Sequence, residues 1–342
     1  MYIPFEPEYR EKYAKLLEEI FDSGLYSHGS MTEKFETMFA SFSGLSSVAL
    51  TSGGTGLSAL LAYVDVRGKD VIVPTNTFIA TPLAVKFMGG NPIFSDCKKE
   101  DLCIGVEQIK EVLTPNTKAV IVVHIGGHIA FDIEAISTFC DEQGLALIED
   151  CAHAHGAVFK GKTAGGYGVG GAYSFYATKT MPMGEGGMVV SKHPDVAEFV
   201  KLYRNYGKKP IGDGRFEYPV EGFNFRMSEI MAAFGIVQME RLPKILAWKR
   251  ALAKKYDQIF PKDKRVVFPE GMESGYYKYI VFDTAVTEKT GAVFDELCHD
   301  LMNVKGVFPN SEWVAKHHVC PPIYYGWEHA DKQFDEIKSM IC

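Results

Sequence analysis

The chain has 342 residues, of which 46% are hydrophobic and 23% are charged, and its formal net charge is −7. This composition is typical of a folded globular protein and excludes a largely disordered one, and the net negative charge argues against a nucleic-acid-binding surface. No apolar run approaches membrane-spanning length and the N-terminus lacks the regions of a signal peptide, so we expect a cytoplasmic protein that does not bind membranes.

The N-terminal half alternates between helix and strand patterns. Apolar residues at helical spacing over about 7–21 predict an amphipathic helix, and residues 30–33 fit a capping box that opens a second helix. Strands are predicted at 47–51, 70–73, 92–95, 118–123 and 145–150, with helices near 57–62, 79–88 and 105–113. This alternation predicts a mainly parallel sheet covered on both faces, with ligands at the carboxyl ends of the strands.

The C-terminal half continues with strands at 172–176 and 188–190 and a helix at 194–204. Residues 205–222 contain several glycines and prolines, which predicts a long exposed loop. Residues 222–227 open another helix. From about Leu242 the pattern changes to a long helix, strands near 265 and 278, a helix near 290–302 and a last helix from about 332. We therefore expect a large domain over residues 1–241 and a small C-terminal α/β domain over residues 242–342.

Lys179 and Asp150 are the candidate catalytic residues. Asp150 ends the buried strand at 145–150, and Ser174 and Lys179 belong to or follow the strand at 172–176. A lone lysine after a strand is usually a solvated surface group, and an acid at a strand end is often a helix cap. Together, however, they are what a pyridoxal phosphate site requires. The lysine holds the aldehyde as a Schiff base, the acid keeps the pyridine nitrogen protonated, and the hydroxyl takes a phosphate oxygen.

These residues also carry a family resemblance. Residues 149–157, the Ser-Phe-Tyr run that starts at Ser174 together with Lys179, and residues 184–187 resemble the DegT/DnrJ/EryC1/StrS sugar aminotransferase family in order and spacing. That family belongs to the fold type I aminotransferases. The resemblance implies transfer of an amino group from L-glutamate to a keto group of a nucleotide-linked deoxysugar, with pyridoxal phosphate as cofactor and pyridoxamine phosphate as intermediate.

Further residues are candidates for holding the cofactor. Small residues at the strand-to-helix turn make Gly54 and Thr55 candidates for the phosphate, although such a turn often only lets a helix pack on a sheet; the family has a Gly-Thr pair here. Phe78 could stack on the pyridine ring or belong to the core. His153, which is also a catalytic candidate beside Lys179 and Asp150, would contact the ring face or the 3′-oxygen, or be a packed loop residue.

Asn224 is the candidate for a contact between subunits. Residues 222–227 resemble a second signature of the family, in which the asparagine reaches the phosphate of the neighbouring subunit's cofactor. The resemblance therefore implies a homodimer with two shared sites. The simpler alternative is that Asn224 only caps a helix.

Two other patterns predict no site. The glycine run at 165–171 precedes a strand, whereas a dinucleotide-binding loop follows one. The seven cysteines are scattered and never form a Cys-x-x-Cys pair, so we expect reduced thiols and no bound metal, including at His317, His318 and Cys320. His124 and His128 follow a strand, and packing or loop hydrogen bonding is their expected role.

Three alternative functions remain at this stage. The same chemistry could act on a smaller phosphorylated ketone, because the C-terminal end looks shorter than is usual for the family. Some relatives use pyridoxamine phosphate to dehydrate a sugar, but they carry histidine in place of the lysine, so Lys179 disfavours this reading. A non-catalytic protein that keeps the fold is the third alternative, and intact Lys179 and Asp150 speak against it.

Overall fold

The computed structural model describes residues 5–284, 291–294, 296–326 and 330–341. Within them a central sheet of seven strands runs in the order β1-β9-β8-β5-β4-β2-β3. Only β9 runs antiparallel to its neighbours, and the other pairs are parallel, which confirms the mainly parallel sheet. The strands are β1 Ser46–Leu50, β2 Asp70–Pro74, β3 Asn91–Ser95, β4 Thr117–Val123, β5 Ala146–Asp150, β8 Gly170–Ser174 and β9 Gly187–Ser191.

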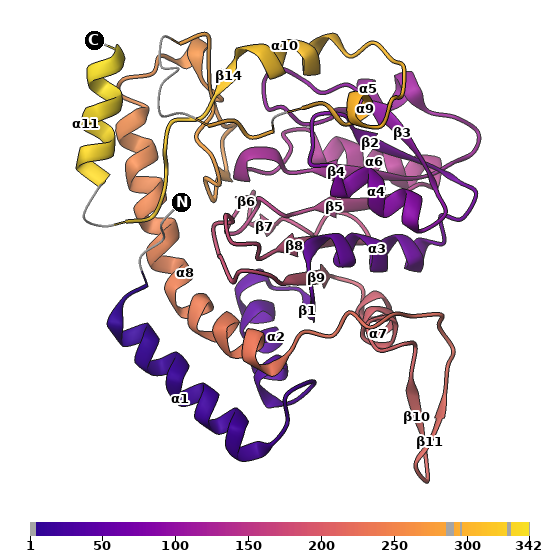
Figure 1. The fold of residues 1–342 in the computed structure, drawn as a ribbon. Helices are drawn as coiled ribbons and strands as arrows, with labels where there is room; N and C mark the ends of the chain where they lie inside the picture. Colours follow the sequence, from indigo (N-terminus) through magenta and orange to yellow (C-terminus); the bar gives the residue numbers. More distant parts are fainter. Residues whose placement is uncertain (1–4, 285–290, 295, 327–329, 342) are drawn as a thin grey trace.

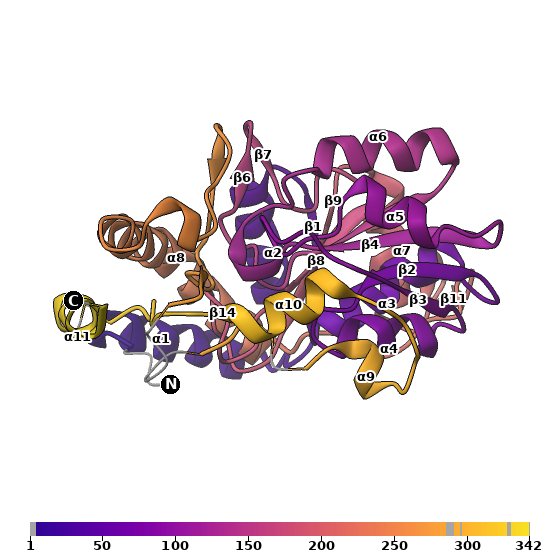
Figure 2. The same ribbon diagram turned by 90° about the horizontal axis from the view of Figure 1, so that it is seen from above.

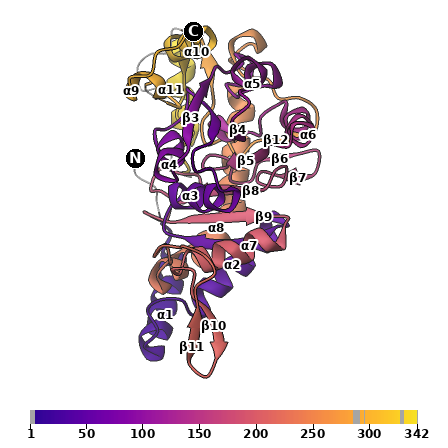
Figure 3. The ribbon, with the colours of Figure 1, turned by 90° about the vertical axis from the view of Figure 1, so that its right-hand side faces the viewer.

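Helices cover both faces of this sheet, with α3 and α4 on one side and α5 and α6 on the other (Figures 2 and 3). Their bounds are α3 Gly53–Val64, α4 Ala80–Phe87, α5 Val106–Val112 and α6 Ile133–Gln143, and α7 Pro194–Tyr203 joins the core of α3 and α4. Successive residues of a strand point to opposite faces of the sheet, and each face has its own apolar core. Val71 and Val73 pack with α3 and α4, and Ile72 packs into the core on the other face. Burial on both faces explains the continuous apolar runs of the sequence. None of the described helices is long and apolar enough to span a membrane.

The helix α8 (Glu229–Tyr256) links the two parts of the fold. Its first half packs against α1 (Pro7–Ser23) and α2 (Ser30–Ser43), and its second half packs against α11 (Ala330–Ile341), as Figure 1 shows. Two helices were predicted on either side of position 242, so that prediction was wrong: one helix continues through it. The second half has its own small apolar core, which includes Leu252, Tyr256 and Ile337. The domain boundary itself stays a prediction.

The C-terminal part contains short elements around α8. They are η2 Lys262–Lys264, β12 Met272–Glu273, β13 Val281–Phe282, α9 Cys298–Leu301, α10 Pro309–His317 and β14 His318–Val319. β13 pairs with β14, and β12 extends the small sheet of β6 Val158–Phe159 and β7 Lys162–Thr163. The strand predicted near 265 is only an isolated bridge between Arg265 and Val281. The helix predicted near 290–302 is present as the four residues of α9, and residues 285–290 and 295 lie outside the described part. α10 was not predicted.

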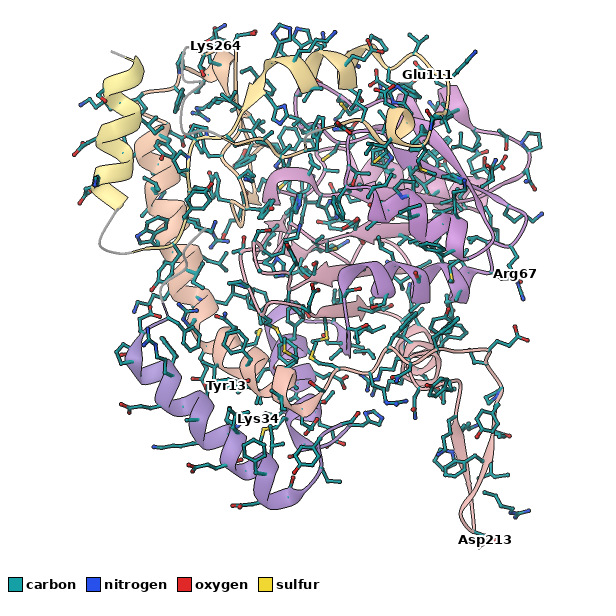
Figure 4. The ribbon with its side chains drawn as sticks, in the orientation of Figure 1. Tyr13, Lys34, Arg67, Glu111, Asp213 and Lys264 are labelled. Atoms are coloured by element: carbon teal, nitrogen blue, oxygen red, sulfur yellow. The ribbon has the colours of Figure 1, made fainter. Side chains whose placement is uncertain are left out.

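Residues 205–222 are not a simple loop as predicted. They contain the hairpin β10 Lys209–Gly212 and β11 Arg215–Glu217, which projects away from the body of the molecule (Figure 1). Asp213 lies at its tip (Figure 4), between two glycines with positive φ, and has a φ of 52° itself. The glycines indicated exposure, but they also serve the tight turn that lets the two strands pair.

The predicted capping box at Ser30 is absent. Gly29 is the N-cap residue of α2, and Ser30 is already the first helical residue. The Glu229 carboxylate accepts hydrogen bonds from the N–H groups of Met31 at 2.8 Å and Thr32 at 3.1 Å. The start of α2 is therefore capped from α8, by a residue that is distant in the sequence.

Candidate active site

Lys179 follows β8 in a turn whose backbone is well fixed. Its N–H donates to the carbonyl of Tyr176 at 2.9 Å, and the N–H of Ala177 donates to the carbonyl of Gly184 at 3.1 Å. Gly184 has a φ of +88°, which side chains disfavour, so the predicted glycine turn is needed to hold this segment. The side chain of Lys179 is half-buried. The turn thus presents one amine at the carboxyl end of β8.

Asp150 ends the neighbouring strand β5 and is 7% exposed. Its Oδ2 accepts a hydrogen bond from Thr81 Oγ1 at 2.9 Å, and its Oδ1 accepts one from the N–H of Ala152 at 3.0 Å. Burial raises the pKa of Asp150, whereas these hydrogen bonds and the charge of Lys179 oppose the rise. Because a carboxylate has about four lone-pair sites, Asp150 can accept a further hydrogen bond from a ring N–H. No sequence pattern pointed to Thr81 as a partner of Asp150.

Burial also changes the pKa of the Lys179 amine. Loss of hydration lowers its pKa from 10.5 to about 8; the charge of Asp150 opposes this change and the charge of Lys278 adds to it. At a pKa of about 8, roughly a tenth of the amine is neutral at pH 7, and the neutral amine is the form that attacks a carbonyl. Lys179 is therefore prepared for nucleophilic chemistry and proton transfer.

His153 and Tyr277 form an aromatic stack beside Lys179. Their ring centres lie 4.0 Å apart with an interplanar angle of 22°, and Lys179 Nζ lies 4.8 Å from the centre of the Tyr277 ring. The N–H of Gly126 donates to His153 Nδ1 at 3.3 Å, which assigns the neutral ring. Burial and the nearby charge of Lys179 lower the pKa of His153 well below its ordinary value. Tyr277 was missed in the sequence; it lies in an aromatic run at 276–279 near a predicted strand, which was the available signal.

The phosphate candidates meet at the start of α3. Gly53 approaches Ser174 so closely that a Cβ on Gly53 would lie 2.8 Å from Ser174 Cβ. The N–H of Thr55 donates to Ser52 Oγ at 3.1 Å, and the N–H of Ser52 donates to Thr55 Oγ1 at 3.0 Å, so Ser52 and Thr55 form a capping box. Gly54 lies in the first turn, where a helix has no carbonyl for its N–H groups. Gly53, which precedes Gly54, thus lies against Ser174, while Thr55 also closes the start of the helix.

Phe78 and Asn224 are both exposed. Phe78 lies between β2 and α4 with 72% of its surface accessible, which excludes the core alternative. Asn224 bridges to Asn205, and Arg226, two residues further on, bridges to Leu50 of the edge strand β1. Asn224 therefore lies at the β1 edge and outside α8, so it is not the N-cap residue, which is Ser228.

His124, Glu149 and Cys151 form a buried group with metal-ligand chemistry. His124 Nδ1 accepts a hydrogen bond from the N–H of Ala130 at 3.1 Å, so its Nε2 donates to Glu149 at 2.9 Å. Glu149 also accepts hydrogen bonds from the N–H groups of Gly165, Tyr167 and Gly168, at 2.7, 2.7 and 3.0 Å. With both oxygens so occupied, the group fits a structural role. The glycine run at 165–171, rejected above as a dinucleotide loop, wraps this carboxylate, and His124 has the expected hydrogen-bonding role.

Comparison with known proteins assigns the chain to a family. Residues 7–304 match the DegT/DnrJ/EryC1/StrS aminotransferase family. The chain belongs to this family. It is 37% identical over 255 residues to GDP-perosamine synthase of Vibrio cholerae, covering 74% of this chain and 69% of the relative. It is 32% identical over 286 residues to dTDP-3-amino-3,4,6-trideoxy-alpha-D-glucose transaminase of Micromonospora megalomicea subsp. nigra, covering 80% and 75%.

The fold agrees with the sequence match. The crystal structure of DesV of S. venezuelae in complex with a ketimine intermediate superposes with a TM-score of 0.87 at 27% identity, covering 97% of this chain and 95% of that chain. The match to the family model ends at residue 304, but the fold likeness covers 97% of the chain. The predicted family, the fold type I architecture and the enzyme class are confirmed, and the protein is an aminotransferase.

Proposed function

We propose that this aminotransferase uses pyridoxal phosphate to move an amino group from L-glutamate to a keto group of a nucleotide-linked deoxysugar. The observation that supports this most strongly is the pairing, at adjacent strand ends, of a half-buried amine with a lowered pKa, Lys179, and a buried carboxylate, Asp150. The nucleotide-sugar acceptor is supported by relatives whose names refer to GDP- and dTDP-linked sugars.

The residues present fit pyridoxal phosphate. Lys179 would hold its aldehyde carbon and Asp150 its pyridine nitrogen, because that carboxylate can accept one more hydrogen bond. Gly54 and Ser174, with Thr55 behind them, would hold the phosphate at the start of α3, and exposed Phe78 and neutral His153 would contact the ring. When bound, the cofactor supplies a conjugated ring that takes up the electron pair released at the donor Cα.

The side chains of this chain supply the remaining chemistry. In the first half of the reaction the neutral Lys179 amine would accept the proton from the donor Cα and pass it on. In the second half the Lys179 ammonium would donate a proton to the carbon that is aminated. The negative charge of Asp150 would stabilise a protonated ring nitrogen. Hydrogen bonds from Thr81 and Ala152 hold the Asp150 carboxylate in one orientation. Tyr277 packs against His153 and the Lys179 amine, and thereby excludes water from one side of the site.

We also propose a cytoplasmic homodimer in which Asn224 reaches the phosphate of the neighbouring subunit's cofactor. Ile211 and Phe216 on the projecting hairpin and Tyr218 just after it are between 41% and 64% exposed. Apolar side chains exposed together in this way are typical of a surface that a partner covers. A second copy of the chain is the occupant that the family resemblance favours.

Subunit mixing tests the shared site. Lys179→Ala and Asn224→Ala subunits are each inactive or weakly active alone. If Asn224 serves the neighbouring site, each mixed dimer has one intact site, and a random mixture regains about a quarter of the wild-type activity. If Asn224 acts within its own chain, the mixture has no more activity than the Asn224→Ala subunits contribute alone, and the shared site is refuted.

Borohydride trapping tests the cofactor assignment. Reduction of the purified holoprotein fixes pyridoxal phosphate to the amine that carries it, and peptide mass spectrometry then locates the adduct. We expect the adduct on Lys179, and none in Lys179→Ala. A matched control is Lys192→Ala, which removes a lysine that follows the neighbouring strand β9 at its other end. An adduct on another lysine of the wild-type protein would contradict the proposal.

A further inference from the structure

Lys278 is a lysine of the C-terminal part whose backbone is fastened to the sheet edge. Its N–H donates to the carbonyl of Gly126 at 2.9 Å, and the N–H of Gly275 donates to the carbonyl of Gly127 at 2.8 Å. Gly126 and Gly127 follow β4, the strand that pairs with β5. Lys278 is therefore positioned by the same edge that carries Asp150.

The ammonium group of Lys278 lies at the proposed catalytic centre. Its Nζ lies 5.5 Å from the centre of the Tyr277 ring, and Lys179 Nζ lies 4.8 Å from the same centre. Tyr277 in turn stacks on His153. The charge of Lys278 contributes to the lowered pKa values of Lys179 and His153. Two ammonium groups, those of Lys179 and Lys278, thus lie near the Tyr277 ring.

Lys278 lacks a carboxylate partner among the ion pairs of the described residues. Lys98 is likewise not fully exposed, but it lies 2.9 Å from Asp132 and 3.8 Å from Asp101. The acid of the site, Asp150, accepts hydrogen bonds from Thr81 and Ala152 and interacts with the charge of Lys179. A half-buried ammonium without a carboxylate partner among the described residues is available to pair with an anionic ligand.

We propose that Lys278 binds the α-carboxylate of the amino donor, an inference that rests on the proposed function. The α-carboxylate is bonded to the Cα whose proton passes to Lys179. Its oxygens must therefore lie close to Lys179 Nζ. Lys278 Nζ and Lys179 Nζ both lie within 5.5 Å of the centre of the Tyr277 ring, so the flexible Lys278 side chain can reach a carboxylate held beside Lys179. The diphosphate of a nucleotide sugar is separated from its keto carbon by atoms of the sugar ring, and the cofactor phosphate belongs to the start of α3.

The same residue is compatible with the acceptor. In the second half of the reaction a neutral sugar replaces the donor in the same space. An ammonium group has three donors on a flexible stem, so Lys278 can then hydrogen-bond a sugar hydroxyl. A fixed aspartate–lysine pair at this position would bind neither ligand well.

Rapid mixing of the holoprotein with amino donors tests the proposal. The variants are Lys278→Met, which removes the charge, and Lys278→Arg, which keeps it; Lys254→Met, on the exposed side of α8, is the matched control. We expect Lys278→Met to raise the half-saturating concentration of both L-glutamate and L-glutamine at least tenfold while the limiting rate changes less than threefold. Lys278→Arg restores most of the binding, and Lys254→Met behaves as wild type. Calorimetric binding of glutarate, which does not react, weakens in parallel.

The other outcomes are distinguishable. Unchanged donor constants, or a change only in the pH dependence of the limiting rate, would overturn the proposal. A loss restricted to L-glutamate would assign Lys278 to the side-chain carboxylate instead and would also overturn it. Weaker binding of the nucleotide keto-sugar with donor binding intact would assign Lys278 to the diphosphate, with the same consequence. If wild-type protein reacts with no amino acid, the proposed function has failed before any variant is compared.

Discussion

Lys179→Met should stabilise the protein in the absence of cofactor. The amine of Lys179 has lost hydration, and its pKa falls from 10.5 to about 8. Below pH 8 the folded protein must therefore keep a proton on a group that binds protons more weakly than it does in the unfolded chain. Methionine has a similar length and carries no charge, so the substitution removes this cost and keeps the packing.

The size and the pH range of the effect follow from the same two values. A change of one pKa unit corresponds to about 1.4 kcal/mol. The fall of the Lys179 pKa from 10.5 to about 8 therefore sets an upper limit of about 3 kcal/mol on the gain in the free energy of unfolding. Partial exposure of the side chain reduces it, and we expect roughly 1–2 kcal/mol at pH 7. Between pH 8 and 10.5 the unfolded chain binds more protons, so wild-type stability rises with pH and the difference disappears.

Urea denaturation of the cofactor-free proteins at several pH values between 7 and 10.5 measures this difference. Lys86→Met, which removes an exposed lysine of α4, is the control and should show no comparable gain. Lys179→Met that is no more stable than wild type at pH 7 would refute the reasoning. A gain that persists unchanged at pH 10.5 would also refute it, because the cause would then be packing and not charge.

Three further predictions follow from individual contacts. Glu149→Gln places an NH₂ group against backbone N–H donors that now bind a carboxylate, so we expect a loss of about 3 kcal/mol in the free energy of unfolding, measured by urea denaturation; an unchanged midpoint would contradict it. Glu229→Ala removes the cap of α2 and should cost about 2 kcal/mol in the same assay, whereas Glu240→Ala, on the exposed side of α8, should cost less than 0.5 kcal/mol by the general tolerance of surface sites. Thr81→Val leaves Asp150 Oδ2 without its hydroxyl donor, and we expect kcat to fall about tenfold with little change in KM, with Thr81→Ser restoring most of it; a normal kcat in Thr81→Val would exclude a positioning role.

The central sheet, and the position of Asp150 and Lys179 at one edge of it, could be predicted because their signals are local. Continuous apolar runs mark β2, β4 and β5 as strands buried on both faces, and the residue after such a run lies at the functional edge. Asp150 and Lys179 lie at the same edge because β5 and β8 are neighbours that pair in parallel, within the mainly parallel sheet that the sequence pattern predicts.

The remaining features depend on contacts between distant parts of the chain. Tyr277 stacks on His153 across more than a hundred residues, and Glu229 caps a helix that begins at Ser30. No local pattern records such contacts. The continuous helix α8 was predicted as two because its buried face changes where its packing partners change, from α1 and α2 to α11. The hairpin at 209–217 was missed because its exposed strands lack the apolar alternation of a half-buried pair.

The visible absorbance of the purified holoprotein, followed during sequential additions, tests the central proposal most directly. L-glutamate is added first, and a nucleotide-linked keto-sugar is added after the absorbance has settled. We predict that glutamate abolishes the band of the lysine-bound cofactor and that the keto-sugar restores it. Restoration only by small phosphorylated ketones would contradict the proposed acceptor, and a protein without any such band would contradict the cofactor assignment.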